Sequence, residues 1–199
     1  MSALTDLSMA LGETTEKALR GIVLVRSGEH EAGTGAVWHE DGLVLTNAHV
    51  VERGPVSVTL HDGRALPARV LAKDDFQDLA ALAVDAHSLP VIQVGFSRDL
   101  QPGAYVMALG NPWGLRGVAS GGVVIGTETY HTRDGGERRL LAVDLRVRPG
   151  NSGGPLLDAE GRLVGIVAMM AGPGVALAVP VHQAKTFLKQ ALAKELAAA

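Results

Sequence analysis

The chain has 199 residues and carries 18 Lys and Arg against 21 Asp and Glu, a formal net charge of −3. A charge this close to zero, without a basic block, argues against nucleic acid or an anionic membrane as the main partner. The hydrophobic content of 47% excludes wholesale disorder, and the absence of cysteine excludes disulfides, thiolate zinc sites and a cysteine nucleophile.

The N-terminal residues predict a helix over Thr5–Arg20, with Thr5 as its N-cap. The apolar positions near helical spacing are Leu7, Leu11, Ala18 and Leu19. This segment holds three acidic residues where a secretory leader has a basic region followed by an apolar one. The chain as written is therefore expected in the cytoplasm, and the periplasm or cell envelope stays open if a leader has been removed.

After Gly21 the sequence changes to short apolar or alternating runs that are separated by turn signals such as Asp41-Gly42 and Asp62-Gly63. The runs are Ile22–Val25, Ala36–Trp38, Leu43–Thr46, Val56–Leu60, Ala68–Leu71, Leu79–Val84, Ile92–Val94, Tyr105–Leu109, Val118–Ile125, Leu140–Leu145, Pro155–Leu157, Leu163–Ala168 and Val175–Val179. About a dozen strands without helices between them indicate an antiparallel sandwich or barrel. The polar stretch Ser88–Pro102 is the expected boundary between two sets of strands.

The last part of the chain raises one alternative and predicts one helix. Leu163–Val181 is a run of nineteen residues without a charge, long enough to suggest a membrane span. Because Ala171-Gly172-Pro173-Gly174 lies in its middle, two strands around a turn fit the run better. The final helix is predicted from apolar residues at helical spacing, namely Ala184, Phe187, Leu188, Ala191 and Leu192.

The hexapeptide Gly150-Asn151-Ser152-Gly153-Gly154-Pro155 is the most informative motif. A serine hydroxyl becomes a nucleophile when a base removes its proton, and the oxyanion that forms needs donors already aimed at it. Small residues around Ser152 allow a tight backbone that directs N–H groups toward one point. The same residues also match the G-x-S-x-G elbow of esterases, but that fold needs a histidine after the serine, and only His182 lies there.

His49 is the favoured base among seven histidines, because it follows the apolar strand Leu43–Thr46 by three residues and a candidate nucleophile and carboxylate accompany it. His182 is interpreted as a residue at the start of the last helix. The remaining histidines lie beside charged or turn residues and are interpreted as solvated: His30, His39, His61, His87 and His131.

The third member must be a carboxylate that fixes the imidazole tautomer and stabilises the imidazolium. Asp78 is the candidate, because it stands directly before the apolar run Leu79–Val84, where it can be buried. Asp74 and Asp75 lie in a polar turn and are weaker candidates, and Asp144 is expected to give structural support.

Five further segments accompany the hexapeptide: Gly33-Thr34-Gly35, Thr46–Val51, Asp78-Leu79-Ala80, Leu109–Gly114 and Val175–Pro180. In this order they resemble trypsin-like serine proteases of the HtrA (Deg) type, and the resemblance covers roughly residues 21–189. It implies an all-β fold of two antiparallel six-stranded, chymotrypsin-like barrels with helices at both ends. The whole chain, 1–199, would be one protease domain, with barrel one at about 21–95, barrel two at about 103–180 and the last helix at 182–196.

The resemblance also implies the roles of the site residues. His49 is the general base, Asp78 its orienting carboxylate and Ser152 the nucleophile. The oxyanion hole is expected at Gly150, Asn151 and Ser152, through the backbone N–H groups of Gly150 and Ser152. The specificity pocket is expected to be formed by Val147, Ala168, Met169 and Met170.

Nothing anionic lines this stretch, so the hypothesis is cleavage after small or medium aliphatic residues. Arg146 and Arg148 flank Val147, and a preference for acidic residues is the lesser alternative. Extended substrates are expected to add a strand at Ala168–Met170. The chain departs from the family pattern at Pro149, where an arginine often precedes the glycine.

The leading functional hypothesis is an ATP-independent serine endopeptidase of protein quality control that acts on unfolded or damaged polypeptides, without cofactor or metal. The alternative is a catalytically latent protease fold that serves as a chaperone or peptide-binding module. The family usually carries a C-terminal PDZ domain, and this sequence is expected to be a protease domain without one, either a lone domain or part of a longer chain. By the same resemblance the chain is expected to form a homo-oligomer, a trimer in many family members.

Overall fold

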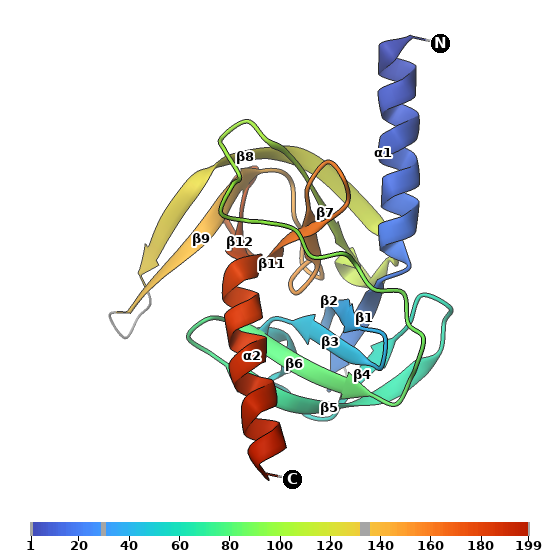
Figure 1. Ribbon diagram of the computed structural model, residues 1–199, viewed down its shortest axis with the longest axis vertical. Helices are drawn as coiled ribbons and strands as arrows, with labels where there is room; N and C mark the ends of the chain where they lie inside the picture. The colour runs from blue at the N-terminus through green and yellow to red at the C-terminus, as the bar shows by residue number, and fades with distance from the viewer. Residues whose placement is uncertain (1, 29–30, 132–135, 199) are drawn as a thin grey trace.

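In the computed structural model, which describes residues 2–28, 31–131 and 136–198, the strands form two six-stranded antiparallel sheets, each closed into a barrel (Figure 1). The expected all-β fold with two six-stranded barrels is therefore confirmed. The first barrel contains β1 (Ile22–Ser27), β2 (Glu31–His39), β3 (Leu43–Thr46), β4 (Val56–Thr59), β5 (Ala65–Asp74) and β6 (Leu79–Val84). The second contains β7 (Tyr105–Gly110), β8 (Val118–His131), β9 (Glu137–Asp144), β10 (Pro155–Leu157), β11 (Leu163–Gly172) and β12 (Val175–Pro180).

Both barrels have the same strand order. In the first, neighbours run β1-β2-β3-β6-β5-β4, and the pairing of β4 with β1, with Val58 opposite Val25, closes the sheet. In the second, read from β7, the order is β7-β8-β9-β12-β11-β10, and the pairing of β10 with β7 closes the sheet. β-branched and other aliphatic side chains fill each interior. Because of the closing pairs, none of β1, β4, β7 and β10 is an edge strand of an open sheet.

A third apolar cluster joins the barrels to each other. It brings Leu45 and Leu79 of the first barrel together with Leu140 and Ile166 of the second, all of them fully buried. This shared core fixes the relative position of loops that leave the two barrels on the same side, where the proposed active site lies.

The chain begins and ends with helices. α1 (Ala3–Leu19) extends from the body beside the second barrel, and α2 (Val181–Ala198) packs against β5 and β6 of one barrel and β11 and β12 of the other (Figure 1). The expectation that Thr5 caps α1 is wrong. Ser2 is the N-cap, and its Oγ accepts a hydrogen bond from the N–H of Thr5, which is already inside the first turn.

One predicted strand, Ile92–Val94, is absent. Among the described residues, its only ladder contact is a single parallel bridge between Val94, in the connection between β6 and β7, and Leu163. The apolar side chain of Ile92 is buried in the core shared by the barrels, although its segment does not pair as a strand. Burial of a connecting loop gives the same short apolar run as a strand.

Two other segments bear on predictions from the sequence: β8 is longer than predicted, and the uncharged run 163–181 forms strands. β8 continues beyond the predicted Ile125 to His131, as a hairpin with β9 whose end is exposed and polar, so no alternation marks it. The uncharged run 163–181 forms β11 and β12, which pair with each other. Among the helices of the described ranges, none has the length and apolar character required to span a bilayer.

Candidate active site

His49 is carried by a short 3-10 helix, Ala48–Val51, that directly follows β3. Its neighbours Ala48 and Val50 are buried in the first barrel, whereas the His49 side chain is 44% exposed. Burial of the residues on either side anchors the backbone of His49 and leaves its imidazole at the edge of the barrel.

Asp78 lies beside this imidazole, immediately before β6. The His49 Nδ1 is 2.9 Å from Asp78 Oδ1 and 3.0 Å from Oδ2, and the His49 backbone N–H donates to Oδ1 at 3.1 Å. Asp78 is 7% exposed and has a positive φ of 56°, a conformation that Asp tolerates better than most residues. Asn47 Nδ2 donates to the Asp78 carbonyl at 2.8 Å and so stabilises this turn.

Ser152 stands on a tight loop that precedes β10. Gly150 has φ +101°, and a Cβ at that position would come within 2.5 Å of the Asn111 carbonyl oxygen. Gly153 has φ +81°, and a Cβ there would collide with Thr34 and Thr46 of the first barrel. The glycines are therefore required by the backbone conformation and by the close approach of the two barrels.

The backbone donors of this loop are divided between two uses. The Asn151 N–H donates to the Arg148 carbonyl at 2.9 Å, and Asn151 Oδ1 accepts from the Arg148 N–H at 3.1 Å. Asn151 thus closes the turn and does not offer its N–H to an oxyanion. The N–H groups of Gly150 and Ser152 donate to no group in the described part of the chain. The Ser152 hydroxyl donates to the Ala168 carbonyl at 3.2 Å.

Thr34 of β2 holds the loop from the other barrel. Its Oγ1 donates to the Gly150 carbonyl at 2.7 Å, and its N–H donates to the Ser152 carbonyl at 2.8 Å. The Asn111 N–H in turn donates to Thr34 Oγ1 at 2.9 Å. Thr34 and Asn111 are 0% and 2% exposed, so these bonds are shielded from water.

Both residues lie inside sequence motifs, Gly33-Thr34-Gly35 and Leu109–Gly114, but the sequence indicates no role for either. The signal that could have found Thr34 is its place between Gly33 and Gly35. Two small neighbours permit another backbone to come close to the residue between them. A Cβ at Gly33 would indeed lie 3.1 Å from the Ser152 carbonyl oxygen.

Two cavities contain both His49 and Ser152. One, of about 390 Å³, is also lined by Val147, Ala168, Met169 and Met170, together with Arg148 and Pro149. The other, of about 440 Å³, lies on the side of Glu52 and Pro149. All the residues that the sequence predicts for the site, except Asp78, line one or both of these cavities. Asp78 is buried behind the imidazole of His49. Asn151 lines the first cavity, but its N–H is bonded within the loop.

The other candidate carboxylates are engaged elsewhere. Asp74 Oδ1 accepts from the Gln77 N–H at 2.8 Å, and Asp75 forms an ion pair with Lys73 at 2.7 Å. Asp144 lines a separate groove beside Arg146.

The other histidines within the described residues lie away from Ser152. His39 and His87 both approach Asp41, and His131 approaches Glu137. His182 contacts Ser97, whereas His30 lies outside the described residues. Within those residues, no group of three or more His, Asp or Glu side chains could hold a metal ion.

The chain is similar to known proteases in both sequence and structure. Residues 33–166 match the family described as trypsin-like peptidase domain. The sequence is 38% identical over 172 residues to the putative serine protease HhoB of a Synechocystis strain, and 38% identical over 165 residues to the mitochondrial serine protease HTRA2 of Drosophila willistoni. These matches cover 83% and 80% of this chain, and 41% and 38% of the relatives, so the chain spans about two fifths of their length.

Solved structures show the same likeness. The HtrA-type protease AlgW with a tripeptide superposes with a TM-score of 0.84 at 27% identity, over 90% of this chain and 62% of that one. The serine endoprotease from Yersinia pestis superposes with a TM-score of 0.79 at 28% identity, over 91% of this chain and 66% of that one.

Proposed function

Because the chain belongs to the trypsin-like peptidase family and is of the HtrA type, we propose that it is a serine endopeptidase with Ser152 as nucleophile, His49 as general base and Asp78 as orienting carboxylate. The observation that carries this proposal is the two-oxygen contact between Asp78 and His49 Nδ1, at 2.9 and 3.0 Å. A proton on Nδ1 is held there by the carboxylate, so Nε2 is the ring nitrogen that acts as the base toward Ser152.

The proposed reaction follows from these contacts. Ser152 Oγ attacks the scissile carbonyl carbon while its proton passes to His49, and the imidazolium that forms faces Asp78. The oxyanion accepts from the N–H groups of Gly150 and Ser152. The C–N bond then breaks as His49 returns the proton to the leaving amine. A water next attacks the acyl carbon while His49 takes one of its protons, and the C–Oγ bond breaks as that proton returns to Ser152 Oγ.

Substrate binding would also redirect the serine proton. The Ala168 carbonyl, which accepts from Ser152 Oγ, lies on β11 where the strand pairs with β12 alone. A substrate strand that adds to this edge offers its own N–H to that carbonyl. The Ser152 hydroxyl is then displaced and turns toward His49.

The specificity proposal is cleavage after small or medium aliphatic residues. Val147, Ala168 and Met169 give the 390 Å³ cavity an apolar wall, and no carboxylate lies among its lining residues. A lysine or arginine side chain would lose its hydration there without gaining an ion pair, which is unfavourable. Because an added strand must be extended, unfolded or damaged polypeptides are the proposed substrates, and quality control the proposed role.

The first test compares the wild-type protein with Ser152→Ala on casein, an unfolded substrate. The wild type should cleave casein and the variant should show no cleavage above background, because loss of a triad member leaves only about 10³–10⁴-fold catalysis over water. Equal cleavage by both proteins would contradict the proposal. Binding of casein by both without cleavage would instead favour the latent chaperone or peptide-binding alternative.

The second test maps the cut sites on that unfolded substrate by mass spectrometry. We expect Val, Ala, Leu or Ile before most of the cleaved bonds. Dominant cutting after Lys or Arg would contradict the apolar pocket, and dominant cutting after Asp or Glu would point to Arg146 and Arg148 as the specificity determinants.

A further inference from the structure

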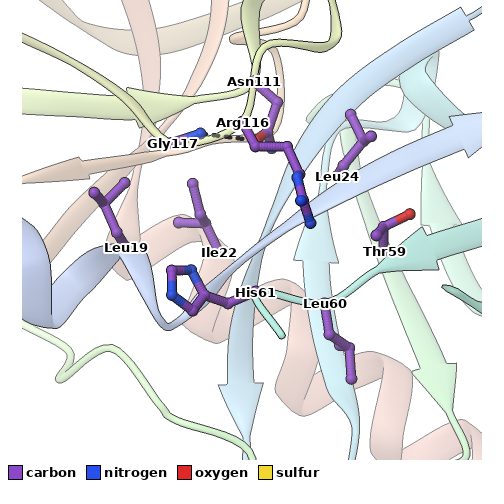
Figure 2. Close-up of a pocket in the computed structure, with 9 residues that line it drawn as sticks. All are labelled: Leu19, Ile22, Leu24, Thr59, Leu60, His61, Asn111, Arg116 and Gly117. Carbon is purple, nitrogen blue, oxygen red and sulfur yellow. Dashed lines mark hydrogen bonds between the residues drawn. The ribbon is translucent and has the colours of Figure 1, made fainter. Parts of the chain in front are cut away.

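A cavity of about 260 Å³ lies between the end of α1, strands β1 and β4, and the segment that follows Asn111 (Figure 2). It shares no lining residue with the two cavities that contain His49 and Ser152. Its apolar wall is formed by Leu19, Ile22, Leu24 and Leu60. The cavity is therefore a separate feature of the molecule, and the proposed reaction does not use it.

Two basic side chains, Arg116 and His61, border this apolar wall. Figure 2 shows Arg116 and His61 reaching into the same space from different segments of the chain. Arg116 forms no hydrogen bond or ion pair with any residue in the described ranges, and no Asp or Glu lines the cavity. The neighbouring carboxylate, Asp62, is already occupied by Arg64, whose backbone N–H and Nε donate to it at 3.0 and 2.8 Å.

This combination selects a ligand with an alkyl chain and one negative end. We propose that the cavity binds a short aliphatic carboxylate of the fatty-acid class, with its chain against Ile22 and Leu24 and its carboxylate on Arg116. Guanidinium groups pair with carboxylates through two parallel N–H bonds. Each methylene that leaves water for the apolar wall adds to the affinity.

A chain of hydrogen bonds connects the wall of this cavity to the oxyanion loop. The Gly117 N–H donates to Asn111 Oδ1 at 3.2 Å, and Asn111 donates to Thr34 Oγ1 through its N–H and its Nδ2. Thr34 Oγ1 donates to the Gly150 carbonyl at 2.7 Å. A carboxylate held on Arg116 restrains the adjoining Gly117, so occupancy favours the arrangement that holds Gly150. The meaning of this coupling for catalysis rests on the proposed function, whereas the binding does not.

Binding is tested by calorimetry on the Ser152→Ala protein with octanoate as the probe, so that the result is independent of proteolysis. We expect saturable one-to-one binding of octanoate, weaker binding of 1-octanol, and none of octylamine. Arg116→Gln should weaken octanoate binding about fivefold or more, whereas Arg98→Gln, which removes an exposed arginine outside the cavity, should not. Absence of binding, equal binding of octylamine, or unchanged affinity in Arg116→Gln would overturn the proposal.

Coupling is tested on the same Ser152→Ala protein by backbone amide NMR. Saturating octanoate should shift the amide signals of Gly117 and, through Asn111 and Thr34, of Gly150. Shifts that stay confined to the cavity residues would overturn the coupling. If wild-type protein fails to cleave casein while octanoate still binds and shifts these signals, the proposed function falls and the site stands.

Discussion

Thr34 is the residue on which the two halves of the proposed active site depend most directly. A single side chain from the first barrel donates to Gly150 and accepts from Asn111, and its backbone N–H holds Ser152. Because the carbonyls of Gly150 and Ser152 are both held from behind, the loop is fixed in the orientation that leaves the N–H groups of those residues unbonded within the described chain. Preorganised donors of this kind need no rearrangement as the oxyanion forms.

Replacement of this hydroxyl tests that role. We expect Thr34→Val to lower kcat about tenfold or more with little change in KM, because the substrate pocket is intact while the donors are less well held. The buried Gly150 carbonyl and Asn111 N–H lose their partner, so unfolding free energy should also fall by about 1–3 kcal/mol.

Thr34→Ser is the matched control, since it keeps the hydroxyl and removes only a methyl group. It should retain most of kcat, measured on a peptide whose cleavage is followed by fluorescence. If Thr34→Val loses stability but keeps the wild-type kcat, Thr34 is a structural residue alone.

For single residues, the sequence identifies the candidate reactive groups but not the residues that hold them in position. Ser152, His49 and Asp78 each lie in a motif whose chemistry is recognisable. The structure places Asp78 beside His49, and His49 and Ser152 line the same two cavities. Thr34 and Asn111 are neutral residues that occur in any strand or loop. Their roles come from contacts more than seventy positions away in the chain, which no local pattern reveals.

Among the elements, α2 is fixed at its start by a partly buried contact with the connection between the barrels. Ser97 Oγ lies 2.8 Å from His182 Nδ1 and also accepts from the His182 backbone N–H at 3.3 Å. Burial, reinforced by repulsion from Arg98, lowers the pKa of His182 below its ordinary value of about 6.5. The neutral imidazole can accept the Ser97 proton, and protonation removes that acceptor.

This contact predicts the pH dependence of stability. Because the pKa of His182 is lower in the folded than in the unfolded chain, the unfolded chain takes up the proton first as pH falls below about 6.5. Stability is therefore lost as pH falls from about 6.5 toward the folded pKa, and no further loss from this residue occurs below it.

We expect the Tm difference between the wild type and His182→Gln to be largest at pH 7.5 and to narrow by pH 5. Ser97→Ala should lower Tm at pH 7.5 and keep the acid trend, since burial and Arg98 are unchanged. Thermal unfolding followed by circular dichroism measures both, and a gap that is constant with pH would contradict this account.

At the scale of elements, the sequence predicts the bounds of a strand well where its residues are buried, and less well where they are exposed. β6, with four consecutive fully buried residues, was predicted with its observed bounds. No pattern predicts the exposed end of β8, because both of its faces meet water. The pattern wrongly predicts a strand at Ile92–Val94, because a buried connection is as apolar as a strand. Ser2 and Thr5 are both good caps, and only the backbone shows which one begins α1.

For the whole molecule, the apolar cluster between the barrels predicts that the two sheets unfold as one cooperative unit. Leu45, Leu140 and Phe187 come from the first barrel, the second barrel and α2, and all lie in this cluster. Strand order within each barrel could not be derived from spacing alone. It depends on the pairings of β1 with β4 and of β7 with β10, which join strands distant in the sequence and close the sheets.

The two tryptophans report on this cooperativity. Trp38 lies on β2 and packs against the shared cluster, whereas Trp113 lies beside the loop of the second barrel. With Trp38→Phe and Trp113→Phe, each remaining tryptophan can be followed separately in urea. We expect both variants to show one transition whose fluorescence midpoint coincides with the circular dichroism midpoint. A fluorescence midpoint that departs from the circular dichroism midpoint in either variant would show that the barrels unfold independently.

The proposed endopeptidase activity depends on an activated Ser152, and a fluorophosphonate probe measures that activation directly. Intact-mass and peptide mass spectrometry should find one adduct per chain, on Ser152, that forms rapidly in the wild type and is nearly lost in His49→Ala. Modification at another residue, or labelling of Ser152 at the same rate with and without His49, would contradict it.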